Sequence, residues 1–256
     1  MSTKWEIEFK NIGIHSSPRA ADLNNDGVKD LIIGCSKKEF EQNDTAIIAV
    51  DGATGKILWK VAARDQIFGS AAFLDINRDH VPDIIIGGRA AELQAIDGKT
   101  GKVIWAFFPK GNSREPRKKG WFNFYNPQII PDQNGDGIED ILVTNGGDIL
   151  APPYDPNRPT GNLLVLDGSN GKLLALAKVP DGKETYMSIV ISKLSEADSD
   201  YTIVFGTGGE TIGGNLYRTT LKDVMIGDIS TAVLLASSKD KGFIAPPILC
   251  DLNLDG

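Results

Sequence analysis

The chain has 256 residues, of which 41% are hydrophobic and 24% are charged, and its formal net charge is −7. This is enough apolar sequence for a sizeable globular core. The acidic balance argues against nucleic acid as a general partner, because phosphate backbones attract basic surfaces, and no apolar run approaches the length of a membrane-spanning helix. Residues 1–4 lead directly into a strand-like segment, so we expect any leader peptide to have been removed or to lie outside this sequence.

The first predicted element is an isolated β-strand at residues 5–9, with the sequence WEIEF. The second is a loop at residues 22–30 (DLNNDGVKD), which carries side-chain oxygens at alternate positions and leads into an apolar run. The pattern returns at residues 75–83 and 132–140, and a further copy begins at residues 251–256. Such regular recurrence predicts repeated structural units. The three intact copies are called the acidic loops below.

The chemistry of the acidic loops favours Ca²⁺, which accepts about six to eight oxygen ligands. Asp22, Asn24, Asp26 and Asp30 can direct side-chain oxygens at one centre, and the carbonyl of Val28 can fill the gap between them. No Cys or His lies at ligand spacing, which argues against a transition metal. An EF-hand is excluded, because the twelfth position holds an aliphatic residue where Glu is required. For a single copy, an Asx-turn without metal is the alternative.

The sixth position of each acidic loop is expected to need a backbone with φ > 0. Gly27 and Gly137 occupy it in the first and third copies, whereas His80 occupies it in the second and must tolerate the bend.

A second recurring element is a glycine-rich turn between two apolar runs, which predicts a β-hairpin. These turns lie at residues 51–56, 97–102 and 167–172. One acidic loop and one hairpin together give four antiparallel strands, the composition of a β-propeller blade. Trp59 and Trp105 recur after the turns, so we expect them to pack in or between blades and not to act in catalysis.

A degenerate fourth unit follows at residues 189–206, where only Glu196 and Asp198 keep oxygens at donor positions. Leu194 and Thr202 replace the first and last Asp, so we expect no metal there. Residues 214–223 have the character of a worn copy of the hairpin.

These elements predict an all-β protein, a β-propeller with about four complete blades in a ring that this sequence does not complete. The expected units are a closing strand at 1–10, blades at 11–64, 65–110 and 120–180, a degenerate blade at 181–240, and the start of another blade at 241–256.

The loop pattern Asp-x-Asn-x-Asp-Gly-x-x-Asp followed by Ile-Ile-Gly resembles the FG-GAP (VCBS-type) repeats of integrin alpha-chain propellers and many secreted bacterial proteins. The Asp-Gly-x-Thr-Gly-Lys-x-x-Trp hairpins resemble those of PQQ-like propellers, and the two resemblances together cover essentially the whole chain. The resemblance implies about three structural Ca²⁺ sites on the face opposite the ligand site. The implied ligands are Asp22, Asn24, Asp26, Val28 and Asp30, then Asp75, Asn77, Asp79, Val81 and Asp83, then Asp132, Asn134, Asp136, Ile138 and Asp140.

A partner is expected on the other face, where connections of variable length meet, because long loops on a rigid scaffold commonly carry function. The longest connections are residues 108–126 and 146–162. The candidate ligand-binding residues are Arg89, Arg114, Arg117, Trp121, Tyr125, Tyr154 and Arg158. A solvated basic loop with its aromatic side chains folded over the rim is the alternative. His15, Asn126 and Tyr186 lie near the starts of first strands and could border a central channel, although a structural role is favoured for His15.

The sequence therefore predicts a secreted, calcium-stabilised module that binds or adheres to protein or glycan. A polysaccharide lyase is one alternative, with Arg89, His15 and the basic residues 114–119 as candidates, and a PQQ-dependent dehydrogenase is a weaker one. Binding is preferred because the chain has two histidines and no nucleophile elbow. Weak calcium loops saturate at extracellular calcium levels, which favours an extracellular, cell-surface or periplasmic location. Cys35 and Cys250 are expected to be buried free thiols, with a disulfide between them as the alternative.

Overall fold

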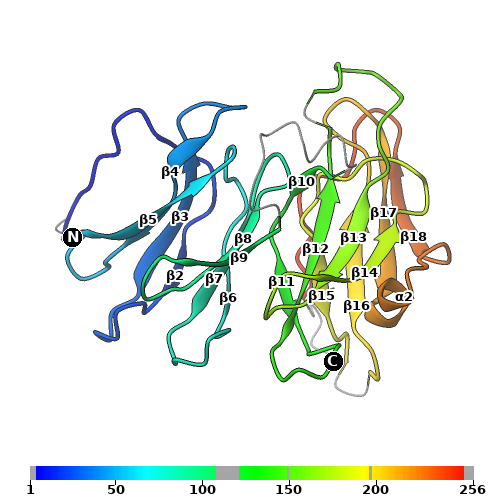
Figure 1. The fold of residues 1–256 in the computed structure, drawn as a ribbon. Helices are drawn as coiled ribbons and strands as arrows, with labels where there is room; N and C mark the ends of the chain where they lie inside the picture. Colours follow the sequence, from blue (N-terminus) through cyan, green and yellow to red (C-terminus); the bar gives the residue numbers. More distant parts are fainter. Residues whose placement is uncertain (1–3, 108–120, 149, 196–197, 251–256) are drawn as a thin grey trace.

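A computed structural model describes residues 4–107, 121–148, 150–195 and 198–250 of the chain. Its strands form four antiparallel sheets that stand side by side in chain order (Figure 1). The described sheets do not close into a ring. The predicted all-β class and the repeated antiparallel units of four strands are confirmed.

Each sheet is formed from consecutive strands. The first contains β1 (Gly13–Ile14), β2 (Arg19–Ala21), β3 (Asp30–Ser36), β4 (Asn43–Val50) and β5 (Ile57–Ala63). The second contains β6 (Ala72–Leu74), β7 (Asp83–Gly87), β8 (Leu93–Ile96) and β9 (Val103–Ala106). The third contains β10 (Asn123–Phe124), β11 (Gln128–Ile130), β12 (Asp140–Gly146), β13 (Asn162–Leu166) and β14 (Leu173–Lys178). The fourth contains β15 (Val190–Ser192), β16 (Thr202–Gly206), β17 (Gly214–Thr220) and β18 (Val233–Ser238), with the helix α2 (Leu221–Met225) after β17.

The five strands of the first and third sheets arise because the strand that enters the acidic loop is divided. β1 and β2 both pair with β3, and β10 and β11 both pair with β12. Each sheet therefore has the same four-strand plan.

Burial follows the position of a strand in its sheet. Every residue of β7, β8, β12 and β13 is buried, which explains the continuous apolar runs of these middle strands. In β5 the pattern alternates, with Trp59 and Val61 buried and Lys60 exposed. A sheet that is apolar on both faces must be covered by its neighbours. Accordingly, three hydrophobic clusters each join side chains of two successive sheets.

The fourth-strand tryptophans join one sheet to the next. The Nε1–H of Trp59 donates to the carbonyl of Gly98 at 2.7 Å, and that of Trp105 donates to the carbonyl of Gly168 at 2.9 Å. Each indole also lies against a later glycine of the same turn. A Cβ at Gly101, whose φ is +70°, would come within 2.6 Å of the Trp59 ring. The prediction that these tryptophans pack between blades is confirmed.

The N-terminal segment makes the same contact without being a strand. Residues 5–9 were expected as a closing strand. The structure assigns no strand there, and the described residues hold no last blade with which it could pair, so its closing role stays a prediction. The segment docks on the first sheet by a side chain, because the Nε1–H of Trp5 donates to the carbonyl of Gly52 at 2.9 Å. A tryptophan in this sequence position therefore signals a docking contact, both where its backbone is paired, as at Trp59 and Trp105, and where it is not, as at Trp5.

Helix α2 replaces the glycine-rich turn in the fourth sheet. Thr220 caps it, accepting a hydrogen bond from the backbone N–H of Asp223 at 3.2 Å and donating to the Asp223 carboxylate at 2.8 Å. The residue of β14 that corresponds to Trp59 and Trp105 is Ala175, and Val224 of the helix is buried in the same cluster as Ala175. The strands of the worn hairpin are present as predicted, and the helix fills the position that tryptophan takes at the other joints.

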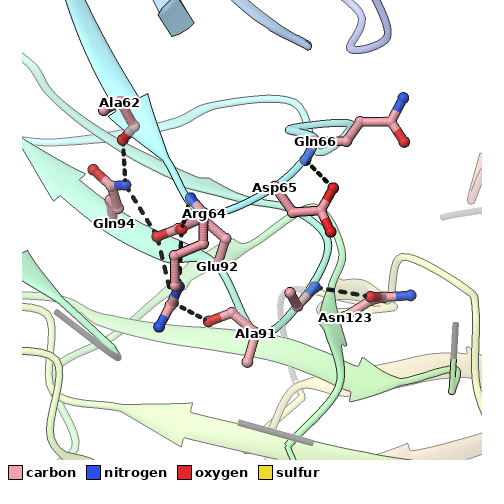
Figure 2. A network of polar contacts seen from close by, with 9 residues as sticks. Ala62, Arg64, Asp65, Gln66, Ala91, Glu92, Gln94 and Asn123 are labelled. Carbon is pink, nitrogen blue, oxygen red and sulfur yellow. Dashed lines mark hydrogen bonds and ion pairs between the residues drawn. The ribbon is translucent and has the colours of Figure 1, made fainter. Parts of the chain in front are cut away.

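A buried ion pair forms a second joint between the first and second sheets (Figure 2). The Nε of Arg64 lies 3.0 Å from Oε2 of Glu92, and the backbone N–H of Arg64 donates to the same oxygen at 2.7 Å. Gln94 extends the network by donating to Glu92 Oε1 and to the carbonyl of Ala62. The side chain of Glu92 is 3% exposed, so removal of Arg64 would leave a buried charge unpaired.

The two cysteines have different environments. Cys35 is a buried free thiol as predicted, and burial raises its pKa to about 11. Cys250 is exposed, so the expectation that it is buried is wrong. It follows β18 in a segment that is described without a strand or helix.

Replacement of the bridging indole should weaken the fold. Trp59→Phe keeps an aromatic ring but leaves the Gly98 carbonyl without its donor, so we expect the free energy of unfolding to fall by about 1–3 kcal/mol. Urea denaturation measures this change. Tyr154→Phe, at a side chain that is 76% exposed, is the matched control and should have almost no effect. Equal losses in the two variants would contradict the joint.

Candidate functional site

The acidic loops close on their own backbone. In the first loop, the carboxylate of Asp22 accepts hydrogen bonds from the N–H groups of Asp26 and Gly27 at 3.2 and 2.9 Å. Oδ1 of Asn24 also accepts from Asp26, and Oδ1 of Asp26 accepts from Val28 at 2.7 Å. The other two acidic loops repeat these bonds. In each, the side chain at loop position 3 accepts from the N–H of position 5, and the side chain at position 5 accepts from the N–H of position 7. The Asp at position 1 again accepts from the N–H of position 6. These N–H donors stabilise the ionised carboxylates. In the third loop, the N–H of Gly137 is the main cause of a lowered pKa at Asp132.

The sixth loop position has the left-handed backbone that the sequence predicted. Its φ is +81° at Gly27, +66° at His80 and +83° at Gly137. His80 therefore adopts the bend without glycine, as expected for the second loop.

The ninth residue of each loop has a role that the sequence did not reveal. Asp30, Asp83 and Asp140 are fully buried. Oδ2 of Asp83 accepts from the N–H of Ile76 at 2.9 Å, and Oδ1 accepts from the N–H of Gly98 at 3.0 Å. The equivalent bonds recur in the other two loops.

This buried carboxylate therefore ties the acidic loop to the glycine-rich turn of its own sheet. Burial raises the pKa of Asp83 and of Asp140, and the backbone N–H donors oppose that rise.

The donors of the acidic loops fit Ca²⁺ by their chemistry, since all of them are oxygens. The fifth residue of each loop, Asp26, Asp79 or Asp136, uses one carboxylate oxygen in the backbone bonds described here. Among the described residues, no three or more His, Cys, Asp or Glu side chains are gathered as a metal site. Calcium at these loops therefore stays a prediction that rests on the donor set.

The fourth loop is closed by a different acid. Oδ2 of Asp198 accepts from the N–H groups of Leu194 and Ser195, both at 3.0 Å. Glu196 lies outside the described residues, as does the fifth copy of the loop at residues 251–256.

At the other end of the strands lies a recess of about 470 Å³, to which all four sheets contribute. Four of its charged residues follow the second strand of a sheet, and three of its aromatic residues lie in the segments that enter the acidic loops. These charged residues are Glu39, Arg89, Asp148 and Glu210, and the aromatic residues are Phe68, Tyr125 and Tyr186. The rings form a row, with centroids 5.4 Å apart for Phe68 and Tyr125 and 6.1 Å apart for Tyr125 and Tyr186.

The structure brings three of the predicted binding residues together here, since Arg89, Tyr125 and Arg158 all line the recess. Tyr154 lies close to its edge, where the backbone N–H donates to Thr211, another lining residue. Trp121 instead packs edge-on against Phe107, at a centroid distance of 5.1 Å.

The other sequence candidates are more scattered. Arg114 and Arg117 lie outside the described residues. Tyr186 lines the recess, whereas the side chain of Asn126 accepts a hydrogen bond from the backbone of Ser70 at 2.6 Å. His15 is exposed.

Two ion pairs organise the walls of the recess. Nη1 of Arg158 lies 3.6 Å from Oε2 of Glu184, and both side chains are almost fully buried. Nη2 of Arg89 lies 3.2 Å from Oε1 of Glu39, and its guanidinium lies over the Phe40 ring at 5.4 Å. Burial raises the pKa of Glu184, and burial together with the charge of Glu184 raises the pKa of Tyr186 to about 12.

Three buried polar atoms at the recess have no hydrogen-bond partner among the described residues. They are the hydroxyl of Tyr125, Nε of Arg89 and Oε2 of Glu184. The described part of the chain has five such atoms in all, so their gathering at one recess is notable. Unpartnered buried polar groups are uncommon in folded proteins and call for a physical explanation.

The sequence analysis missed Glu39, Glu184 and Glu210, because acids in loops of unequal length give no periodic signal. The aromatic row did leave a signal. Phe68 and Tyr125 each precede the first Asp of an acidic loop by seven residues, and His15 holds the same place before Asp22.

Comparison with known proteins identifies the family. A model of the FAM234A/B β-propeller matches residues 22–223. The chain belongs to this family. Protein FAM234A of Bos taurus is 25% identical over 205 residues, a match that covers 68% of this chain and 34% of that protein. The chain thus spans about a third of the length of this FAM234A relative.

Solved structures are similar to this chain at low sequence identity. A europium-containing methanol dehydrogenase matches with a TM-score of 0.53 and 14% identity, over 92% of this chain and 45% of that one. BBS1N, crystallised in complex with ARL6DN, matches with a TM-score of 0.49 and 12% identity, over 88% of this chain and 55% of that one. With the family match, the first of these confirms the predicted β-propeller. FG-GAP repeats and PQQ-like hairpins stay predictions. Among the described residues, no helix has the length and apolar character needed to cross a membrane.

The buried ninth Asp should matter to stability even without calcium. In EDTA, Asp83→Ala leaves the N–H groups of Ile76 and Gly98 unpaired, so we expect the free energy of unfolding to fall by about 2–4 kcal/mol. Asp79→Ala removes an exposed carboxylate of the same loop and should cost clearly less. Chemical denaturation of the two variants compares them, and a larger loss in Asp79→Ala would contradict this assignment.

Proposed function

We propose that this chain is a protein-binding β-propeller module that engages its partner through the end of the sheets that carries the recess. The observation that carries the proposal is the recess itself. Every described sheet contributes to its walls, and three unpartnered buried polar atoms border it. Groups that a folded chain leaves unsatisfied at one exposed recess can be satisfied by a bound partner.

The rim of the recess has the composition of a protein interface. Phe40 and Tyr154 are 47% and 76% exposed, and Leu150 is 38% exposed. Aromatic side chains and arginine are enriched where proteins bind one another, and a few of them commonly supply most of the binding energy. These features favour a protein partner. Glycan binding, polysaccharide lyase and PQQ-dependent dehydrogenase activities are not favoured by a specific contact among the described residues.

The acidic loops have a separate role in this proposal. They lie at the opposite end of the strands, so Ca²⁺ bound there would stabilise the first two strands of each blade without touching the partner. Saturation of such loops needs millimolar calcium, which supports an extracellular, cell-surface or periplasmic location.

Calcium removal tests whether Ca²⁺ bound to the acidic loops stabilises the blades. EDTA should lower the melting temperature by about 5 °C, with recovery on addition of Ca²⁺ but not Mg²⁺, because an ion that binds only the folded state stabilises it. Scanning calorimetry measures the shift. A variant with Asp26→Asn, Asp79→Asn and Asp136→Asn should lose the response to calcium. An unchanged melting temperature of the parent chain in EDTA would contradict the calcium sites.

Site-specific crosslinking tests the binding face. A photoreactive benzoylphenylalanine at position 154 should capture a defined protein from cells that produce the chain. The same group at Lys99, which is exposed in the glycine-rich turn at the acidic-loop end, is the control and should not capture it. The captured protein is then purified, and its affinity for the parent chain and for Tyr154→Ala is measured by calorimetry. We expect about tenfold weaker binding by the variant. Equal capture at both positions, or unchanged affinity, would contradict the proposed face.

A further inference from the structure

We propose that the recess binds a basic side chain, lysine or arginine, presented by the partner. This inference rests on the proposed function and specifies what the recess recognises. Three independent features of the recess lead to it, namely its charge, its aromatic row and its unpartnered acceptors.

The recess has more acids than bases. Its ionisable residues, apart from the tyrosines, are Glu39, Asp148, Glu184, Glu210, Arg89 and Arg158, so four carboxylates face two guanidinium groups and leave a formal charge of −2. Both guanidinium groups are already paired, one with Glu39 and one with Glu184. The acids act on the aromatic row as well. The pKa of Tyr186 is raised first by burial and then by the charge of Glu184, with smaller contributions from Glu210 and Asp148, while the charge of Arg158 opposes the rise. A carboxylate or phosphate group of a partner would be repelled here.

The aromatic row adds a second attraction for a cation. Phe68, Tyr125 and Tyr186 line the recess, with Tyr125 in van der Waals range of both neighbours. The face of an aromatic ring carries partial negative charge and attracts ammonium and guanidinium groups, most strongly when both are shielded from water. The same rings can pack against the aliphatic stem of Lys or Arg.

The unpartnered atoms indicate which hydrogen bonds are missing. Glu184 is 1% exposed, and its Oε2 lies 3.6 Å from Nη1 of Arg158 but has no partner at hydrogen-bond distance among the described residues. The hydroxyl of Tyr125 is likewise unpartnered at a residue that is 8% exposed. Both can accept, and a basic side chain brings only donors, three from ammonium or five from guanidinium. Nε of Arg89 needs an acceptor instead, which a peptide carbonyl beside the basic residue would supply. This favours a basic residue within a protein over a small free amine.

Small model compounds test the inference on the full chain. N-acetyl-lysine methylamide and N-acetyl-arginine methylamide are titrated into the isotope-labelled protein, and backbone amide shifts are followed by NMR. We expect saturable shifts at the amides around the recess, such as those of Gly147 and Tyr186, which weaken as NaCl is raised. N-acetyl-norleucine methylamide, N-acetyl-glutamate methylamide and methyl glucoside are the matched controls and should leave these amides unchanged.

A pair of Glu→Gln substitutions, each of which removes one negative charge with little change of shape, completes the test. Glu210→Gln, at an exposed acid of the recess, should weaken binding of the lysine compound by about fivefold. Glu139→Gln, at an exposed acid in the third acidic loop, should leave it unchanged. Equal binding of the norleucine compound, shifts with methyl glucoside alone, or no shift with either basic compound would overturn the inference. The protein-binding function would still stand after those results if Tyr154→Ala lowered the affinity for the crosslinked partner. The proposed function and the inference about a basic side chain can therefore fail separately.

Discussion

The hydrogen bond from a tryptophan indole to a glycine carbonyl of the next sheet is the contact on which the arrangement of the blades depends. A sheet whose middle strands are apolar on both faces cannot be stable alone, and it must be held against a neighbour at a defined position. The indoles of Trp59 and Trp105 do this from the outer strand, where hydrophobic packing is weakest and half of the residues face water. The glycine opposite each ring is required because any side chain there would occupy the space of the ring. Between the third and fourth sheets there is no such indole, and the smaller Ala175 and helix α2 hold the sheets together by apolar packing.

Within a sheet, the buried ninth Asp of the acidic loop plays the corresponding part. Its two carboxylate oxygens hold the loop on one side and the glycine-rich turn on the other, for example at Asp83. The acidic loop and the glycine-rich turn of one sheet are thus directly connected by hydrogen bonds to the same side chain. An ion bound to the loop would act through this carboxylate on the hairpin of its own sheet. Its effect would reach the overall stability of the blade and leave the geometry at the far end of the strands almost unchanged.

Local patterns allowed most of the fold to be predicted. The acidic loops, the glycine-rich turns and the alternating or continuous apolar runs all lie within about ten residues, the range over which strand and turn preferences act. Two segments differ from what their neighbours in sequence suggest. Residues 5–9 have a strand-like composition but no described strand to pair with, and the capping of α2 by Thr220 and Asp223 was overlooked in a segment that otherwise copies a hairpin.

The recess was less predictable, because its residues come from separate sheets and meet only in three dimensions. Tyr125 and Arg158 were selected for their chemistry in long connections and Arg89 as a cation near the channel mouth, and the structure places all three at the recess. Their role in binding stays a prediction. The acids that pair with the arginines lie 50 and 26 residues away from them, as Glu39 from Arg89 and Glu184 from Arg158, which is far outside any local pattern. Two members of the aromatic row, Phe68 and Tyr125, could have been found by aligning the repeats on their first Asp, since both precede it by seven residues. Tyr186 could not, because the fourth unit has Leu194 in place of that Asp.

The acidic loops and the recess lie at opposite ends of the strands, and the carboxylates at the two ends have different environments. Carboxylates of the acidic loops are compensated by backbone N–H groups and lie at exposed turns, where an ion can reach them. Two carboxylates of the recess, those of Asp148 and Glu184, are instead buried near aromatic rings. Water cannot solvate them well there, and a guanidinium or ammonium group is the natural counter-charge. Arg158 supplies that charge for Glu184, whose pKa is nevertheless raised, chiefly by burial and to a smaller extent by the charge of Asp148. The imbalance is built by two neighbouring sheets, since Asp148 follows β12 and Glu184 precedes β15. The excess of negative charge therefore exists only while these sheets stay packed together. The selectivity of the recess for a positive charge thus depends on the assembled blades.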